Sequence, residues 1–365
     1  MAFGKIGLPA AAALTALAAA TAGEACTSLV LTTTSGAQVY GRTMEFGVDL
    51  QSEGVVIPRG YALAATGPDG KPGLGWTTTY AAAGLNAFGL PILADGVNEK
   101  GLAGGMLLFP GYAGYVPVAE ADPARAIAGW DFLTWALTNF ATVAEVRAAL
   151  GGIEISDVPQ PQMGGVLPLH YTLVDETGAR LVVEPIGGKL VAHDNPLGVL
   201  TNAPSFDWHI TNLGNYVNLT SLDALPREGG GIKVAPIGQG SGMLGMPGDA
   251  TPPSRFIRAA TYVLSVEDVP DGPEAVRLTE HVMNNFDIPP GWIRLPEGQS
   301  GPLETTQWTG IADTASRTYY VKSYGDATLR EIDLMSFDLD AKTIRTAALA
   351  PEPVPPALDF SAPAN

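Results

Sequence analysis

The chain of 365 residues contains a single cysteine, Cys26, and this residue stands directly after an alanine-rich leader. A lone cysteine cannot form an intramolecular disulfide, and no second thiol is present to complete a cysteine-based zinc site. The fold must therefore be held together by a hydrophobic core. A chain of this length with 46% hydrophobic residues has enough apolar surface for one.

Residues 1–25 have the features of a secretory leader. Lys5 supplies a short basic region, an apolar run follows it, and small residues occupy the third and first positions before Cys26. The run is alanine-rich and only modestly hydrophobic, which argues against a membrane span. We expect the leader to be removed and the protein to be exported, either to a periplasm or to the medium.

The charge balance limits the possible partners. There are 37 acidic and 20 basic residues, which gives a net charge of -17. Such a charge repels nucleic acids and anionic membrane surfaces. A nucleic-acid partner is therefore not expected.

The residues after Cys26 predict a β-hairpin. The β-branched run TSLVLTTT is followed by the turn candidate Ser35-Gly36 and then by AQVYGRTMEF. If Ser35-Gly36 is a two-residue loop, Cys26 lies opposite Glu45. Arg42 would then point to the other face of a regular strand. A bulge, for which Gly41 is a candidate, or the end of the strand would have to turn one of them to bring both charged residues into one site. Otherwise they are solvent-facing side chains on an exposed strand.

Removal of the leader after Ala25 would leave Cys26 with both a thiol and a free α-amino group. A terminal amine has a pKa of about 7.7 to 8.0, so part of it is unprotonated near neutral pH and can accept the thiol proton. The four histidines are scattered and form no metal-binding pair in the sequence. Two alternatives remain open, namely a buried inert cysteine and a lipid-attachment cysteine.

Five distinctive motifs occur in order along the chain. The first is CTSLVL…YGRTMEFG, in which an arginine stands sixteen residues after the cysteine. The others are DGVNEKGLAGGMLLFPGYAGY at 95–115, VLTNAPSFDWHITNLGNY at 199–216, MPGDATPPSRFIRAA at 246–260 and TQWTGIADTASRTYYVKSY at 306–324. Together these motifs resemble the choloylglycine hydrolase family, which includes bile salt hydrolases and penicillin V acylases.

The resemblance implies an α+β class and a four-layered αββα fold of the N-terminal nucleophile hydrolases, spanning residues 26–349. A proline-rich tail would follow at 350–365. It also implies hydrolysis of a linear carbon–nitrogen amide bond through an acyl thioester, without a metal or an organic cofactor. Candidate substrates are conjugated bile acids, phenoxymethylpenicillin and N-acyl homoserine lactones. The alternative is an exported, non-enzymatic binding protein or lipoprotein.

Five catalytic roles follow from the resemblance. Cys26 would be the nucleophile, and Arg42 would lie beside its thiol. Glu45, at a position where most members carry aspartate, would hold the α-amine. Asn202 would donate its side-chain amide to the oxyanion, and Arg255 would complete the charged site.

The substrate would contact apolar residues in two segments. Leu108 stands where bile salt hydrolases often carry asparagine and penicillin acylases often carry tyrosine, so an oxyanion role there would depend on its backbone N–H. The predicted substrate-binding residues are Phe46, Met106, Leu107, Leu108 and Phe109.

The remaining patterns predict secondary structure and assembly. Helices are expected at 129–151 and 254–265. Two hairpins are expected around turns at 176–178 and 187–188. The glycine-rich segment 212–248 is either a mobile surface loop or, by the resemblance, an extension that reaches neighbouring subunits of a homotetramer or dimer.

Overall fold

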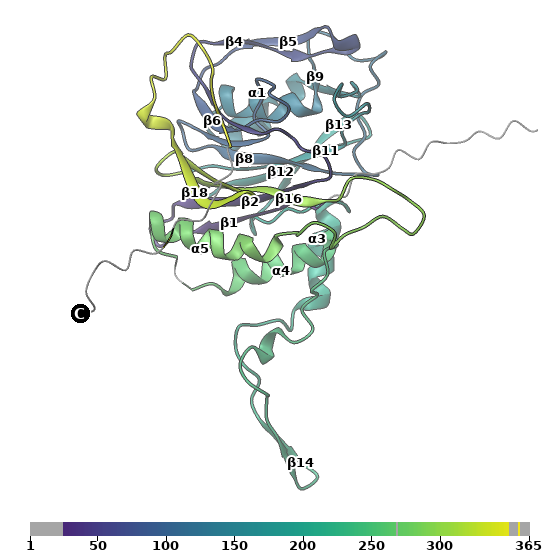
Figure 1. The fold of residues 1–365 in the computed structure, drawn as a ribbon, viewed down its shortest axis with the longest axis vertical. Coiled ribbons are helices and arrows are strands. Elements are labelled where there is room, and N and C mark those ends of the chain that lie inside the picture. Colours follow the sequence, from purple (N-terminus) through teal and green to yellow (C-terminus); the bar gives the residue numbers. More distant parts are fainter. Residues whose placement is uncertain (1–24, 268, 350–356, 358–365) are drawn as a thin grey trace, which may run out of the picture.

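The structure is a computed structural model that describes residues 25–267, 269–349 and 357. The predicted leader therefore lies outside the described residues except for Ala25, and the predicted tail lies outside them except for Ala357. Two antiparallel sheets stack face to face, and helices cover the outer face of each (Figure 1). The predicted α+β class and αββα layering are confirmed.

The first sheet contains β2, the second strand of the hairpin that follows Cys26. All nine residues of β2 are buried, because one of its faces packs on the second sheet and the other packs on helices. In spatial order the strands of this sheet are β1 (Thr27–Thr32), β2 (Gln38–Phe46), β16 (Thr305–Asp313), β17 (Thr318–Ser323) and β18 (Asp326–Asp333).

The second sheet has eight strands, and its middle strands, which pack between the first sheet and the outer helices, are fully buried. In spatial order they are β13 (Lys189–Asp194), β12 (Arg180–Ile186), β11 (Leu169–Val174), β8 (Ala103–Leu108), β7 (Asp95–Asn98), β6 (Ala82–Leu85), β3 (Glu53–Ile57) and β19 (Arg345–Ala348). Two short pairs lie outside this sheet, β4 (Ala62–Thr66) with β5 (Pro72–Thr77) and β9 (Ala126–Ala128) with β10 (Glu154–Ser156).

The helices form the two outer layers. On one side α4 contacts β1 and α5 contacts β2, and on the other side α1 contacts β7 and β8. Within the described residues no helix is long and apolar enough to cross a membrane. The helices are α1 (Phe132–Asn139), α2 (Val143–Ala149), α3 (Phe206–Leu213), α4 (Pro252–Ser265) and α5 (Pro273–Met283).

The predicted register of the first hairpin is wrong by one residue. Thr27 pairs with Thr43, and the Thr33 N–H donates to the Ala37 carbonyl over 2.8 Å. The loop thus has three residues rather than two. Gly36, with φ of +91°, supplies the left-handed conformation that closes a loop of this length.

The observed strand pairing shows on which face of β2 the side chains of Arg42 and Glu45 lie. Arg42 and Glu45 point to opposite faces of β2, with no bulge at Gly41. The irregularity lies instead on the neighbouring strand β16, between Thr306 and Trp308. β2 therefore has no irregularity near Gly41 of the kind that a shared site for both side chains would have required. One face of β2 carries Arg42 toward the second sheet, and the other carries Glu45 toward α4.

The helix predicted at 129–151 is in fact two helices. Thr142 begins α2 by accepting a hydrogen bond from the Glu145 N–H, and the Glu145 carboxylate accepts one from the Ala141 N–H. This pair of hydrogen bonds resembles a capping box, except that Glu145 accepts from the residue before the N-cap, and it starts a new helix within the apolar pattern. The helix predicted at 254–265 is confirmed, with its start two residues earlier.

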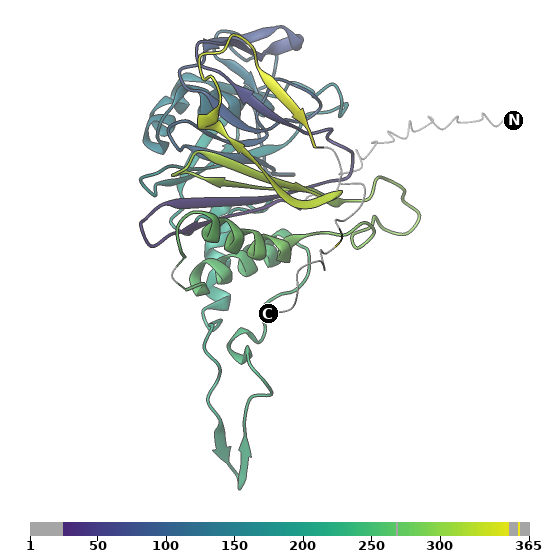
Figure 2. The ribbon, with the colours of Figure 1, turned by 60° about the vertical axis from the view of Figure 1, so that its left-hand side comes forward.

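The two hairpins predicted in the middle of the chain are confirmed as β11–β12 and β12–β13. Segment 212–248 carries a further hairpin, β14 (Arg227–Gly229) and β15 (Ile232–Val234). It projects far from the two sheets as a narrow arm (Figure 2). Gly230 and Gly231 both have positive φ values, as a two-residue hairpin turn requires.

Candidate active site

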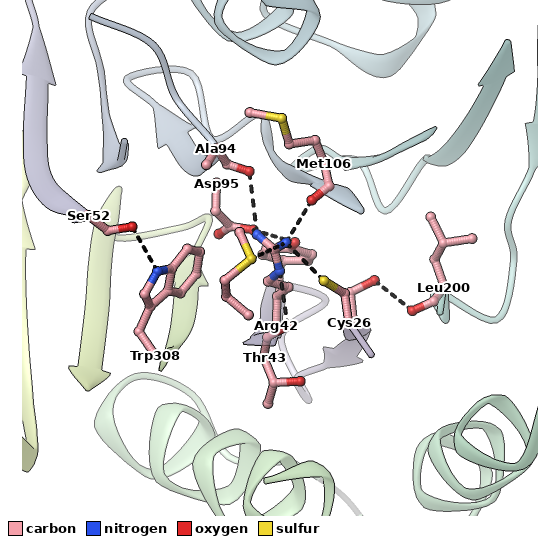
Figure 3. A network of polar contacts seen from close by, with 12 residues as sticks. Cys26, Arg42, Thr43, Ser52, Ala94, Asp95, Met106, Leu200 and Trp308 are labelled. Carbon is pink, nitrogen blue, oxygen red and sulfur yellow. Dashed lines mark hydrogen bonds and ion pairs between the residues drawn. The ribbon is translucent and has the colours of Figure 1, made fainter. Parts of the chain in front are cut away.

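The centre of the site is the fully buried guanidinium of Arg42, which lies between the sheets (Figure 3). Its Nη2 donates to the Cys26 Sγ at 3.4 Å and to the Met106 carbonyl at 2.7 Å. The ring of Trp308 lies 4.9 Å from its Cζ. Burial opposes the charge, but Cys26 and Asp95 outweigh this effect and raise the pKa of Arg42 above its ordinary value. A permanent cation therefore lies against the thiol.

Asp95 holds Arg42 in place. Its carboxylate lies 3.5 Å from the Arg42 Nη1 and accepts hydrogen bonds from Tyr40 at 2.7 Å and from Tyr319 at 2.9 Å. A Cβ at Gly105 would lie 2.2 Å from the Asp95 Oδ2, so only glycine leaves room for this carboxylate. Burial raises the pKa of Asp95 to about 6, although Arg42 acts in the opposite direction.

Cys26 lies at the start of β1 and is 1% exposed. Its backbone N–H donates to the Asn202 Oδ1 over 2.9 Å. Its carbonyl accepts a hydrogen bond from Arg255, which extends from α4 and also donates to the Thr27 Oγ1 at 2.8 Å. Both backbone groups of Cys26 are thus fixed by side chains that the sequence had assigned to the site.

Asn202 connects three parts of the site. Its Oδ1 accepts from the Arg255 Nη2 at 2.7 Å, and its Nδ2 donates to the Leu108 carbonyl at 2.8 Å. A side-chain amide nitrogen carries two protons, so a second donor remains. The Asn202 carbonyl is 3.0 Å from the His209 Nε2, which anchors the loop from the other side.

The Leu108 backbone faces the same part of the site. In a strand the N–H and C=O of one residue point to the same edge. The Leu108 carbonyl meets Asn202, whereas the N–H of Phe109 points the other way and donates to Pro168. The Leu108 N–H therefore points toward the Asn202 side of β8.

Glu45 lies on the helix-facing side of β2 and is fully buried. Its Oε1 accepts from the Thr306 hydroxyl at 2.7 Å, while its Oε2 has no hydrogen-bond partner among the described residues. Burial raises the pKa of Glu45 to about 8 against the effect of Arg255. In the full-length chain the Cys26 nitrogen is bonded to Asn202 rather than to this carboxylate.

A family model described as linear amide C-N hydrolases, choloylglycine hydrolase family, matches residues 26–347. The chain belongs to this family. It is 35% identical over 325 residues to the bile salt hydrolase/transferase of Clostridium perfringens, covering 88% of this chain and 96% of the relative. It is 27% identical over 317 residues to the penicillin V acylase of Pectobacterium atrosepticum, covering 81% and 77%.

The solved structures agree with this assignment. The conjugated bile acid hydrolase of Clostridium perfringens superimposes with a TM-score of 0.80 at 33% identity, covering 92% of this chain and 100% of that chain. The penicillin V acylase of Agrobacterium tumefaciens shares the fold with a TM-score of 0.68, at 24% identity and covering 89% and 92%. The chain is therefore a choloylglycine hydrolase family enzyme that hydrolyses linear amide carbon–nitrogen bonds.

An apolar cavity adjoins the thiol of this hydrolase. Its lining includes three of the five predicted substrate-binding residues, Phe46, Met106 and Leu108. Leu107 and Phe109 point to the opposite face of β8 and do not line it, and Phe109 stacks on His170 instead, with ring centroids 4.4 Å apart. The remaining lining residues are Cys26, Arg42, Met44, Leu50, Ala87, Phe88, Leu90, Ile92, Ala94, Trp130, Gln160, Leu167 and Leu169.

Asp95 was not predicted to belong to the site of this hydrolase, although it begins the second of the motifs that resemble the family. The available signal was an acidic residue directly after the apolar run LPILA at 90–94. A charged residue in such a segment is seldom buried unless it is paired. A buried aspartate therefore indicates a buried cation beside it, and in this structure the cation is Arg42.

Proposed function

We propose that this hydrolase is an exported enzyme whose nucleophile is Cys26 as the mature N-terminal residue. The observation that carries the proposal is the placement of the Cys26 thiol against Arg42 while its nitrogen lies against Asn202. The matched family region also begins at Cys26. A cation beside sulfur favours the thiolate, and an adjacent amine supplies the base.

The mechanism starts with cleavage of the Ala25–Cys26 bond, which frees the α-amine. The amine takes the thiol proton, and the sulfur attacks the amide carbonyl carbon of the substrate. The Asn202 Nδ2 and the Leu108 N–H stabilise the oxyanion. Collapse of this intermediate breaks the carbon–nitrogen bond as the leaving amine takes the proton. Water then attacks the acyl thioester, which releases the carboxylic acid and restores the thiol.

The bond to be cut is itself buried. Ala25 and Cys26 are each 1% exposed in the full-length fold. A peptidase needs an extended and accessible segment, so cleavage takes place before the domain closes around this bond or after local opening. Export in an unfolded state would meet this requirement.

The substrate class is an amide with an apolar acyl group. The cavity beside Cys26 is lined almost entirely by apolar side chains, which suits such a group. Bile-acid conjugates and penicillin V are the first candidates by relationship, and N-acyl homoserine lactones are the alternative. The family match overturns the alternative of a non-enzymatic binding protein.

A substrate panel tests this proposal. Purified mature protein is incubated with glycocholate, taurocholate, penicillin V and a long-chain N-acyl homoserine lactone, and the released acid is measured by mass spectrometry. We expect release of the free acid from at least one of them. If a folded protein that begins at Cys26 releases no acid from any of the four, the proposed substrate class is wrong.

We further propose that the arm in segment 212–248 joins subunits of a homo-oligomer, a tetramer or a dimer. Its apolar side chains project into solvent, with Val217 and Leu225 each 84% exposed and Ile237 fully exposed. Exposed apolar clusters of this kind mark interaction sites. Light scattering should give a multiple of the protomer mass, and charged substitutions at Leu225 and Ile237 should lower it. A monomeric wild-type mass would contradict this assignment.

A further inference from the structure

Glu304 lies beside the bond that must be cut. It immediately precedes β16 and is 3% exposed. The backbone N–H of Ala25 is close enough to lower the pKa of its carboxyl, and its Oε1 has no hydrogen-bond partner among the described residues. Burial raises its pKa, and Arg255 opposes this shift. A buried carboxylate oxygen without a donor is costly unless another state of the protein supplies one.

The strand register places Glu304 near Glu45. Thr306 pairs with Glu45 and donates a hydrogen bond to it. Glu304 precedes Thr306 by two residues, so its side chain lies on the same face of the sheet. The two carboxylates are thus diagonal neighbours, a spacing within reach of long side chains. Both experience the charge of Arg255, and each has one oxygen without a partner.

The charges on the helix-facing side of β2 are unbalanced in the uncleaved chain. Glu45 and Glu304 would carry two negative charges when ionised, and Arg255 supplies one positive charge. Arg42 lies on the other face of β2, where its charge is paired with Asp95. Burial instead raises the pKa values of both carboxyls, because it disfavours the charged forms. A second cation at the start of β1 would restore neutrality and supply donors for both unpartnered oxygens.

We propose that Glu304 is a second carboxylate of the α-amine site. In the uncleaved chain its carboxyl lies near the backbone N–H of Ala25. Once Ala25 has been cut away, it binds the new α-ammonium of Cys26 together with Glu45. This inference rests on the proposed cleavage after Ala25. The charged groups around the amine are Arg42 and Glu45 from β2, Arg255 from α4 and Glu304.

Loss of the negative charge at Glu304 should change the pH dependence of catalysis. A carboxylate beside the amine stabilises the ammonium that forms when the thiol loses its proton. Removing the charge at Glu304 makes the amine lose its proton at a lower pH. Glu304→Gln should therefore shift the acidic limb of the kcat/KM pH profile to a pH about one unit lower. The same substitution should also reduce kcat/KM itself. Glu304→Asp should keep the limb close to its wild-type position, because the charge is kept.

The experiment compares pH profiles of wild type, Glu304→Gln, Glu304→Asp and Glu297→Gln. Glu297 is exposed in the same connecting segment, so it controls for loss of a charge without contact with the site. Intact mass first establishes the terminus of each protein. An unshifted limb in Glu304→Gln would overturn the inference, as would an equal shift in Glu304→Asp. A wild-type terminus other than Cys26 would instead refute the proposed nucleophile.

Discussion

Replacing Cys26 by alanine is expected to lower kcat by about four orders of magnitude or more, since the attacking sulfur is lost and no other nucleophile replaces it. The fold should persist, because the change removes one sulfur atom whose polar contacts are with the Arg42 Nη2 and the Glu45 carbonyl. Steady-state hydrolysis of the best panel substrate measures the loss. Thermal unfolding of both proteins shows whether the fold is intact.

Cys26→Ser is the matched control for this experiment. It keeps a hydroxyl and a terminal amine but lacks the readily ionised sulfur, so it should also be nearly inactive. Both variants should still bind the substrate, because the apolar lining of the cavity is unchanged. Hydrolysis by the folded alanine variant at more than about one hundredth of the wild-type rate would exclude a nucleophilic role for Cys26.

Arg42→Met is expected to destabilise the protein by about 3–5 kcal/mol, because it leaves Asp95 as a buried charge without its cation. The pKa of Asp95, which burial has already raised to about 6, should rise further. A raised carboxyl pKa stabilises the fold at low pH, and this contribution is lost as pH rises through the folded-state pKa. The variant should therefore lose more stability at pH 8 than at pH 5, as urea unfolding at both values would show.

The double variant Arg42→Met with Asp95→Asn separates fold from catalysis. Removing both charges leaves no unpaired carboxylate, so part of the lost stability should return and its pH dependence should flatten. Activity should stay low, because no cation lies beside the Cys26 sulfur. If the double variant is as unstable as Arg42→Met at pH 8, Asp95 is not the reason for the instability.

The layering of the fold could be predicted from the sequence, but the details of the first hairpin could not. The β-branched run and the Ser35-Gly36 turn indicated the correct strands. The loop length depends on the backbone conformation of Gly36, and two-residue and three-residue loops both suit this sequence. The one-residue difference moves Cys26 away from Glu45 and places Arg42 on the thiol side of β2.

Asp95 and Glu304 were not predicted from the sequence because they reach the site through contacts between segments far apart in the chain. The role of Asp95 depends on Tyr40 and Arg42 from β2 and on Tyr319 from β17. Glu304 reaches the start of the mature chain only because β16 pairs with β2. The split between α1 and α2 is a different case, since Thr142 and Glu145 have the spacing of a capping box in the sequence itself.

The intact mass of the protein recovered from the exported fraction tests the role of Cys26 most directly. We expect a chain that begins at Cys26 with an unmodified α-amine and a free thiol. That mass should accompany hydrolytic activity, and a sample in which Ala25 is retained should be inactive. An active enzyme that retains Ala25, or that carries an acylated Cys26, would contradict the claim that cleavage after Ala25 creates the catalytic residue.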